Sequence, residues 1–248
     1  RKIVSLYQKL ETDNPSLENQ FERAQFCSEI LLDSAESFSS YLDRLAKKAT
    51  KNDLIQNIKL AKAKVLLELA SKETYPNNKV EALALLDEII KSDDKSNTSK
   101  LASVQIQNIL SKFLSVELVK NSYENENTGA HISYNNVNKL TISFYKIDLS
   151  QAFKFEEGSE IRKDSLVKLI LQKQKKISSE TYNLIDKKDY FHYSTEVLLP
   201  KLPKGNYLVY FESDSDAKEQ KAIGYETIAV SNISALVSRK DQTETYQV

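Results

Sequence analysis

The sequence predicts an α+β protein in which a helical N-terminal domain, residues 1–112, is followed by a β-sandwich domain, residues 113–248. Phe and Tyr are concentrated in the second part, which holds 16 of the 22, whereas the first part holds 10 of the 16 alanines. Aromatic residues favour strands and alanine favours helices. The hydrophobic period also changes near residues 111–116, from about 3.6 residues to about 2. No Pro/Gly-rich linker lies there, so we expect the last helix to lead almost directly into the first strand.

Composition excludes several classes of protein. Apolar residues make up 40% of the chain, enough to build a core and to argue against disorder. The 35 basic residues balance the 35 acidic ones, so no overall charge draws the chain to nucleic acid or to an anionic membrane. No uninterrupted apolar run approaches the about 18 residues of a membrane span. We expect no nucleic-acid partner, no direct membrane span, no metal and no cofactor.

The first part shows helical periods. Ile3, Leu6 and Leu10 form a short amphipathic stretch, which Asn14-Pro15 ends; Asn14 is the expected N-cap of the next helix and Pro15 its first residue. From there a stripe of residues, all apolar except Ser28, recurs at alternating spacings of 4 and 3, through Leu17, Phe21, Ala24, Ser28, Leu31, Ala35, Phe38, Leu42, Leu45 and Ala49. This period of about 3.5 fits either a coiled-coil seam with another chain or an intramolecular helical hairpin. We favour the hairpin because further amphipathic helices follow at once.

Three more helices are expected over residues 54–69, 78–90 and 102–113. Tyr75-Pro76-Asn77 separates the first two, and Asn78 with Glu81 has the spacing of a capping box. Antiparallel helices of these lengths with short polar turns resemble degenerate tetratricopeptide repeats, although no clean 34-residue period is present.

The second part alternates with a period of 2. Strands are expected around 114–118, 140–144, 177–185, 197–199, 207–211, 223–230 and 234–239, with a polar loop over 121–129. Residues 159–175 have a helical pattern instead. Short strands joined by polar turns predict a sandwich that carries one inserted helix.

The most specific segment runs from Leu199 to Tyr207. Its two prolines keep it out of a central strand, and Gly205 permits a sharp turn two residues before Tyr207. A tyrosine so placed is typical of a tyrosine corner, in which the phenol binds the backbone upstream. Leu202, Gly205 and Tyr207 are therefore predicted to have a structural role and to favour an immunoglobulin-like sandwich.

A family resemblance rests on several ordered segments. Tyr134-Asn135-Asn136-Val137-Asn138-Lys139-Leu140, followed by Phe144-Tyr145-Lys146-Ile147-Asp148, resembles the first β-hairpin region of bacterial α2-macroglobulin-like proteins. Lys188-Asp189-Tyr190, Leu199 to Tyr207 and Tyr225 to Ser231 are similar to later strands of the same macroglobulin domain, and Glu81 to Ile90 resembles the helical region before it. The resemblance covers roughly residues 80–248. One departure is Asn135, where the family more often has Arg.

The resemblance implies a function for the whole protein. Such proteins are large and exported, and they trap proteases after a bait segment is cut; many capture the protease with an internal thioester between Cys and Gln. Here Cys27-Ser28-Glu29-Ile30 lacks the Gln at the fourth place, so we expect Cys27 to be a packing residue. The expected role is a non-catalytic N-terminal scaffold whose partners are other domains of its chain and, through the full-length protein, proteases. The chain begins at Arg1 without a signal-like segment, so we expect a piece of a larger protein in the periplasm or at the cell surface; a lipid anchor upstream stays open.

Other candidate sites have simpler interpretations. Asp189, His192 and Ser194 could suggest a catalytic triad, but they lie within six residues and a triad is normally assembled from distant parts of a chain. His192 is expected to pack at the start of a strand, and His131 to lie in a polar loop. Glu212, Asp214 and Asp216 begin like a calcium loop, but Ala217 and Ile223 stand where Gly and Glu are needed, so an acidic hairpin tip is favoured.

A lysine cluster and two glycosylation sequons complete the candidate sites. A basic cluster, Lys173, Lys175 and Lys176, has no interleaved aromatic residues and is expected to be a solvated helix end rather than a nucleic-acid site. Asn97-Thr98-Ser99 and Asn232-Ile233-Ser234 fit the glycosylation sequon, which matters only in a eukaryotic secretory pathway.

Three functions compete at this stage. The first is the scaffold of a protease-trapping protein, and the second is a helical-repeat adaptor that presents a groove to a peptide at the cell envelope. The third is a hydrolase, which two histidines and the lack of a nucleophile motif disfavour. We expect no enzymatic activity.

Overall fold

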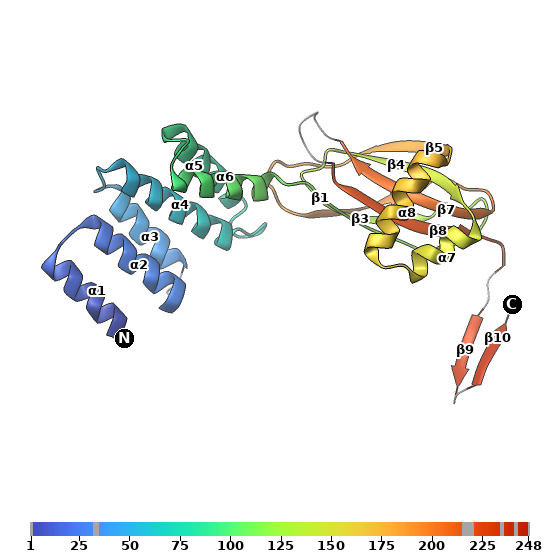
Figure 1. Ribbon diagram of the computed structural model, residues 1–248, viewed down its shortest axis with the longest axis horizontal. Coiled ribbons are helices and arrows are strands. Elements are labelled where there is room, and N and C mark those ends of the chain that lie inside the picture. The colour runs from blue at the N-terminus through green and yellow to red at the C-terminus, as the bar shows by residue number, and fades with distance from the viewer. Residues whose placement is uncertain (1, 32–34, 215–220, 234–235, 241–242, 248) are drawn as a thin grey trace. The chain divides into compact units, whose positions relative to one another are not determined.

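The computed structural model describes residues 2–31, 35–214, 221–233, 236–240 and 243–247, which fall into two compact units (Figure 1). The helical unit comprises residues 1–111 together with 187–191, and the sandwich unit comprises 112–186 and 192–248. Helices and sheets are both abundant, so the predicted α+β class is confirmed. The last helix of the first unit ends at Leu110 and the first strand begins at Phe113, as the change of period predicted.

The helical unit stacks its helices in chain order. Consecutive helices contact one another, and α4 also contacts α2 and α6, so these three helices share one side of the unit. Their bounds are α1 (Lys2–Asp13), α2 (Leu17–Leu31), α3 (Ala35–Ala46), α4 (Asn52–Leu69), α5 (Asn78–Ser92) and α6 (Asn97–Leu110).

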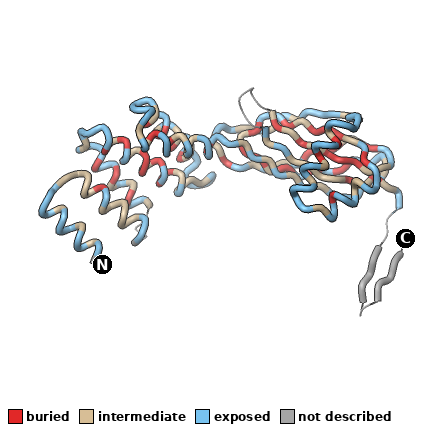
Figure 2. The backbone as a smooth tube through the Cα atoms, in the orientation of Figure 1, coloured by how far each residue is buried: buried red, intermediate tan, exposed pale blue. Residues whose placement is uncertain are grey.

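Two apolar clusters hold the helical unit together (Figure 2). In the first, Leu42 of α3 is fully buried and packs with residues of α2 and α4 such as Phe21 and Ile58. In the second, Leu86 and Ile89 of α5 are fully buried between α4 and α6. The stripe that began at Leu17 thus packs within the chain, as the hairpin interpretation predicted.

The stripe is divided between α2, which ends at Leu31, and α3, which begins at Ala35; residues 32–34 lie outside the described ones. Two local expectations in this unit were wrong. Ser16, not Asn14, caps α2, since its hydroxyl accepts a hydrogen bond from the Asn19 amide at 3.1 Å. Asn78 is the first residue of α5 rather than its cap, and the preceding Asn77 makes no side-chain capping bond.

The sandwich unit contains two main sheets. One has the order β1-β3-β6 and is antiparallel; the other has the order β2-β8-β7-β4-β5 and is antiparallel apart from the short parallel pair of β2 with β8. β9 and β10 pair with each other as a separate hairpin. The strands are β1 (Phe113–Leu118), β2 (Asn121–Ser122), β3 (Gly129–Asn135), β4 (Lys139–Ile147), β5 (Lys176–Asn183), β6 (Tyr193–Leu198), β7 (Gly205–Ser213), β8 (Ile223–Val230), β9 (Leu236–Lys240) and β10 (Thr243–Gln247).

Alternate residues of both sheets form the sandwich core. Phe144 of β4, Phe211 of β7 and Ile132 of β3 are all fully buried in a single cluster. Since side chains alternate across a strand, the intervening residues face outward. A strand that the pattern analysis left out, β3, is the central strand of its sheet; part of the segment assigned to a polar loop therefore belongs to it.

Two helices, not the one expected, are inserted between β4 and β5. They are α7 (Leu149–Glu157) and α8 (Glu160–Lys173), and they cover the outer face of the five-stranded sheet. Phe155, Val167 and Ile170 pack there against Leu208 of β7. α7 was missed because it is short, but its start carries a local signal, a capping box between Asp148 and Gln151.

Candidate functional site

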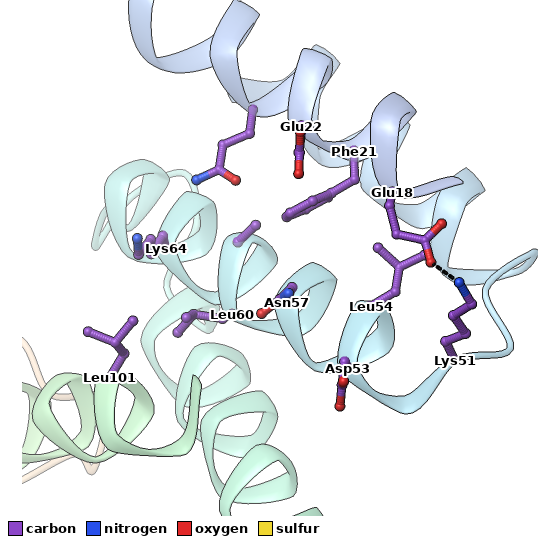
Figure 3. Close-up of a pocket in the computed structure, with 12 residues that line it drawn as sticks. Glu18, Phe21, Glu22, Lys51, Asp53, Leu54, Asn57, Leu60, Lys64 and Leu101 are labelled. Atoms are coloured by element: carbon purple, nitrogen blue, oxygen red, sulfur yellow. Dashed lines mark hydrogen bonds and ion pairs between the residues drawn. The ribbon is translucent and has the colours of Figure 1, made fainter. Parts of the chain in front are cut away.

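A groove of about 590 Å³ lies on the shared side of α2, α4 and α6 (Figure 3). α2 and α4 form its two walls, and Leu101 of α6 contributes to one end. This volume lies within the range of about 300–1,000 Å³ that ligand-binding clefts usually have.

The spacing of residues on two helices explains the groove. Glu18 and Glu22, like Phe21 and Gln25, are four residues apart, and Glu18–Phe21 and Glu22–Gln25 are three apart, so all four share one face of α2. Leu54, Asn57, Ala61 and Lys64 do the same on α4. Phe21 and Leu54 are buried at the floor, whereas the charged ends of Glu22 and Lys64 lie at the rims. In Figure 3 the ring of Phe21 points from α2 toward α4.

One ion pair closes an end of the groove. Lys51, just before α4, places its Nζ 2.6 Å from Glu18 Oε1. This hydrogen bond lowers the pKa of Glu18 below its ordinary value and raises the pKa of Lys51. Both groups are exposed, so salt will screen the pair and its contribution to stability is small.

A second polar link joins α6 to α4. The Thr98 hydroxyl donates a hydrogen bond to Asn57 Oδ1 at 2.9 Å. Beside it Leu101 is 55% exposed, although it lies between buried positions of α6. An apolar floor between charged rims suits the binding of an amphipathic polypeptide segment, in which apolar side chains meet the floor and polar ones meet the rims.

Sequence reasoning anticipated a helical groove but none of its polar residues. Phe21 and Leu54 were identified only as parts of apolar stripes, and Glu22, Asn57 and Lys64 were not identified at all. One residue in the sequence did point to the groove. Leu101 is apolar, yet it lies outside the helical stripe that Ala102, Ile106 and Ile109 form. Which helices share a side is a tertiary property, so the sequence pattern could not assemble these residues.

Of the residues of the predicted tyrosine corner, Leu202 lies between β6 and β7, and Gly205 and Tyr207 lie at the start of β7. The Tyr207 hydroxyl donates a hydrogen bond of 2.7 Å to the carbonyl oxygen of Pro203, four residues upstream. Tyr207 and Leu202 are buried in the sandwich core. Gly205 has φ +150°, a conformation that a side chain would strain, and a Cβ there would approach the Lys146 side chain to 3.1 Å.

The triad candidates have structural contacts. Asp189 accepts a hydrogen bond from the Phe191 amide at 3.1 Å, and the Ser194 hydroxyl shares one with Ser133 at 3.0 Å. The His192 ring meets Phe113 edge-on, with centroids 5.1 Å apart. His192 directly precedes β6, so its expected place at a strand start is confirmed.

The other histidine and the cysteine are also placed by secondary structure. His131 lies in β3, not in the expected loop, and its cross-strand neighbours are Glu117 and Glu196. The loop assignment failed because Gly129, two residues before His131, begins the strand instead of preceding it. Cys27 is half-buried on α2 as a free thiol.

The charged candidates lie near chain turns. Glu212 forms an ion pair with Lys221 at 2.6 Å. The Lys112 ammonium donates a hydrogen bond of 2.7 Å to the Asp214 carbonyl oxygen. Asp216 and Ala217 lie outside the described residues. The basic cluster spans the end of α8 and the start of β5, where its three side chains are exposed.

The sequon residues have different surroundings. Asn97 begins α6. Asn232 Oδ1 accepts a hydrogen bond from the Glu124 amide at 3.1 Å, and Ser234 of this sequon lies outside the described residues.

Within the part of the chain that the structure describes, no three His, Cys, Asp or Glu side chains are grouped so as to hold a metal ion. Nor does any helix there have both the length and the apolar character needed to cross a membrane. A scan against protein-family models found no match to this chain, and a search of curated proteins found no matching relative.

Proposed function

We propose that this chain is a non-catalytic N-terminal scaffold of a bacterial α2-macroglobulin-like protein that traps proteases in the cell envelope. In this proposal the helical unit is a degenerate tetratricopeptide-like domain, and the sandwich unit is an immunoglobulin-like macroglobulin domain. Its partners are the other domains of the same protein and, through them, the trapped protease.

The observation that carries the proposal is the bond from the Tyr207 phenol to the Pro203 carbonyl. The segment from Leu199 to Tyr207 is the most specific segment of the sequence and one of several on which the family resemblance rests, and this bond is the one expected of a tyrosine corner. The bond lies where the chain passes from β6 in one sheet to β7 in the other, the crossover that such a corner stabilises. The role inferred for these residues is structural, which agrees with a scaffold.

A comparison of two forms of the protein tests the proposal. Residues 1–248 and the full-length protein are each mixed with a broad-specificity protease, and residual activity is followed on a large protein substrate and on a small peptide. We expect weak or no inhibition by residues 1–248, because 28.3 kDa cannot enclose a protease of similar size. The full-length protein should slow digestion of the large substrate more than that of the peptide. Stoichiometric inhibition by residues 1–248 alone, or no protection by the full-length protein, contradicts the proposal.

The groove on the helical unit favours a second candidate, an adaptor that binds a helical peptide. Its probe is a fluorescein-labelled amphipathic peptide with Leu at heptad positions a and d and mixed Lys and Glu elsewhere, titrated with the chain while anisotropy is followed. Leu101→Glu should weaken binding at least tenfold, because Leu101 lines the groove. Val104→Glu is the matched control, since Val104 is similarly exposed on the same helix and does not line the groove. Equal effects of both substitutions would exclude the groove as the binding site.

A further inference from the structure

A second hollow, of about 470 Å³, lies at the edge of the five-stranded sheet in the sandwich unit. β8 forms one wall, and the end of α7 with the first turns of α8 forms the other. All the residues that line it belong to the sandwich unit, so it is separate from the groove on the helical unit.

Both faces of β8 contribute to this hollow. Tyr225 faces the helices, where its ring packs against Phe155 at a centroid distance of 6.1 Å. Gly224 faces the opposite way, because a Cβ on it would meet Val116 Cγ2 of β1 at 3.0 Å. Glu226 lies on the Gly224 face and also lines the hollow. A hollow lined from both faces of one strand opens along the edge of that strand.

Strand pairing at this edge is confined to one end, and β1 packs beside the rest of β8 near Gly224 without pairing to it. β7 pairs with β8 along Ile223–Val230, but on the other edge β2 pairs with Ala229 and Val230 alone. The Ala229 amide donates to the Lys120 carbonyl at 2.8 Å, so Ala229 points its backbone groups toward that outer edge. The backbone N–H and C=O groups of successive residues point alternately to the two edges of a strand, so those of Thr227 and Tyr225 also point toward the outer edge. Among the described residues no strand pairs with them there.

Carboxylates predominate around the open edge. Four carboxylates line the hollow: Glu156, Glu160 and Asp164 on the helical wall and Glu226 on β8. Only two lysines, Lys120 and Lys163, line it with them. Lys163 is engaged by Glu160 at 3.1 Å, and the Tyr225 hydroxyl donates to Asp164 Oδ1 at 2.7 Å. The hollow therefore has an excess of negative charge next to a row of backbone donors and acceptors.

We propose that the outer edge of β8, over residues 223–227, binds an extended peptide segment rich in Lys or Arg as an added strand. Main-chain hydrogen bonds to Tyr225 and Thr227 supply the affinity, as in other cases of β-strand addition. Every second side chain of the segment faces the helical wall, where its cation meets Glu160 and Asp164. Exposed strand edges are templates for such pairing unless they are covered. The inference does not depend on the proposed scaffold function, because it rests only on β8 and the helices beside it.

The test uses the whole chain and a labelled peptide of seven residues that alternates Lys and Val. Fluorescence anisotropy is measured during titration at about 20 mM and about 200 mM salt, since charge complementarity at a surface is screened over this range. We expect saturable binding that weakens with salt. The same peptide with every second amide N-methylated should bind at least tenfold more weakly, because it cannot donate to the strand edge. A peptide with Glu in place of Lys should not bind.

Variants of the chain locate the site. Glu160→Gln combined with Asp164→Asn should weaken binding of the basic peptide about tenfold at low salt. The matched control, Glu180→Gln with Glu196→Gln, changes the net charge equally but alters β5 and β6, away from the hollow, and should leave binding unchanged. Thr227→Pro removes a backbone donor that the Glu226 carboxylate also engages, and it should weaken binding. Circular dichroism reports whether this variant folds.

Three results overturn the proposal: no saturable binding of the basic peptide, equal binding of the N-methylated peptide, or equal weakening by the control pair of substitutions. The last would show only diffuse charge attraction. If Thr227→Pro does not fold, the N-methylated peptide and the two charge variants still decide the outcome.

Discussion

At the scale of single residues, Tyr207 ties its own strand to the connection that precedes it. Tyr207→Phe removes only the hydroxyl of a buried side chain and leaves the Pro203 carbonyl without that donor. Because a buried hydrogen bond contributes about 0.5–1.5 kcal/mol, we expect the free energy of unfolding to fall by about 1 kcal/mol. Urea denaturation measures the change. Tyr123→Phe, at a half-exposed position, is the control and should have no effect. Equal stability of Tyr207→Phe and the unaltered protein would contradict this role.

Glu226 makes stability depend on pH in the direction opposite to that of a salt-bridged carboxylate. Burial raises the pKa of Glu226 above its ordinary value, and Lys120 and Lys163 offset this only in part. The folded state then holds the proton more tightly than the unfolded chain, so the free energy of unfolding falls as pH rises from the unfolded pKa through the folded pKa. Glu226→Gln should therefore have little effect near pH 4 and stabilise the protein at pH 7.

Urea denaturation at the two pH values measures this difference for Glu226→Gln. Glu117→Gln, at an exposed position of β1, is the control. A destabilising effect of Glu226→Gln that grows with pH would show that the carboxylate is stabilised by its lysines instead.

At the scale of elements, the segment 187–191 leaves the strand region and packs with the helical unit. The Lys79 ammonium of α5 donates to the Tyr190 carbonyl at 2.7 Å and lies 4.5 Å from the centre of the Phe191 ring. Burial lowers the pKa of Lys79, while Asp189 opposes that shift. Two non-glycine residues of the segment, Lys188 and Tyr190, have positive φ, a conformation that costs energy and needs contacts to hold it.

Lys79→Met should loosen this segment, because it keeps the apolar stem but removes the charge and the donor. A hydrogen bond to a charged group is worth about 1.5–3 kcal/mol, so we expect the Phe191 amide to exchange with solvent about tenfold faster or more. Hydrogen exchange followed by NMR or mass spectrometry measures this rate. Lys100→Met, at an exposed position of α6, should leave it unchanged. Unaltered exchange in Lys79→Met would show that Tyr190 and Phe191 are held by apolar packing alone.

At the scale of the whole molecule, the two units have separate cores. The clusters around Leu42 and Leu86 contain residues of the helical unit only, and those around Phe144 and Phe155 contain residues of the sandwich unit only. Because the units share no apolar cluster among the described residues, we expect each to have its own thermal transition.

Two core substitutions test this independence. Leu86→Ala should destabilise the helical unit by about 2–5 kcal/mol, and Phe144→Ala the sandwich unit by about 3–5 kcal/mol, since each leaves a cavity. In scanning calorimetry each substitution should lower one transition and leave the other in place. If either substitution lowers both transitions together, the units unfold as one and the inference is wrong.

The sequence by itself determined the class of the protein and most of its elements. Hydrophobic periods of 3.6 and 2 are local, so they identified α4, β1, β4, β7 and β8 and the faces that these elements bury. The place of Tyr207 after a turn glycine could be predicted equally well, because the whole motif lies within a few residues. The sequence-based assignment missed α7, which is short, and β3, although Ala130, Ile132 and Tyr134 of β3 alternate with polar residues as in the other strands.

Only the tertiary structure decided which elements meet. Periodicity states that a face is buried but not against what, so it could not reveal that Tyr190 contacts Lys79, 111 residues away in the chain. The same limit applies to both hollows. The groove needs α2, α4 and α6 on one side of the helical unit, and the open edge of β8 exists because β2 is only two residues long and covers only its end. Such features depend on long-range packing, in which each residue's partner is set by the whole fold rather than by its neighbours in sequence.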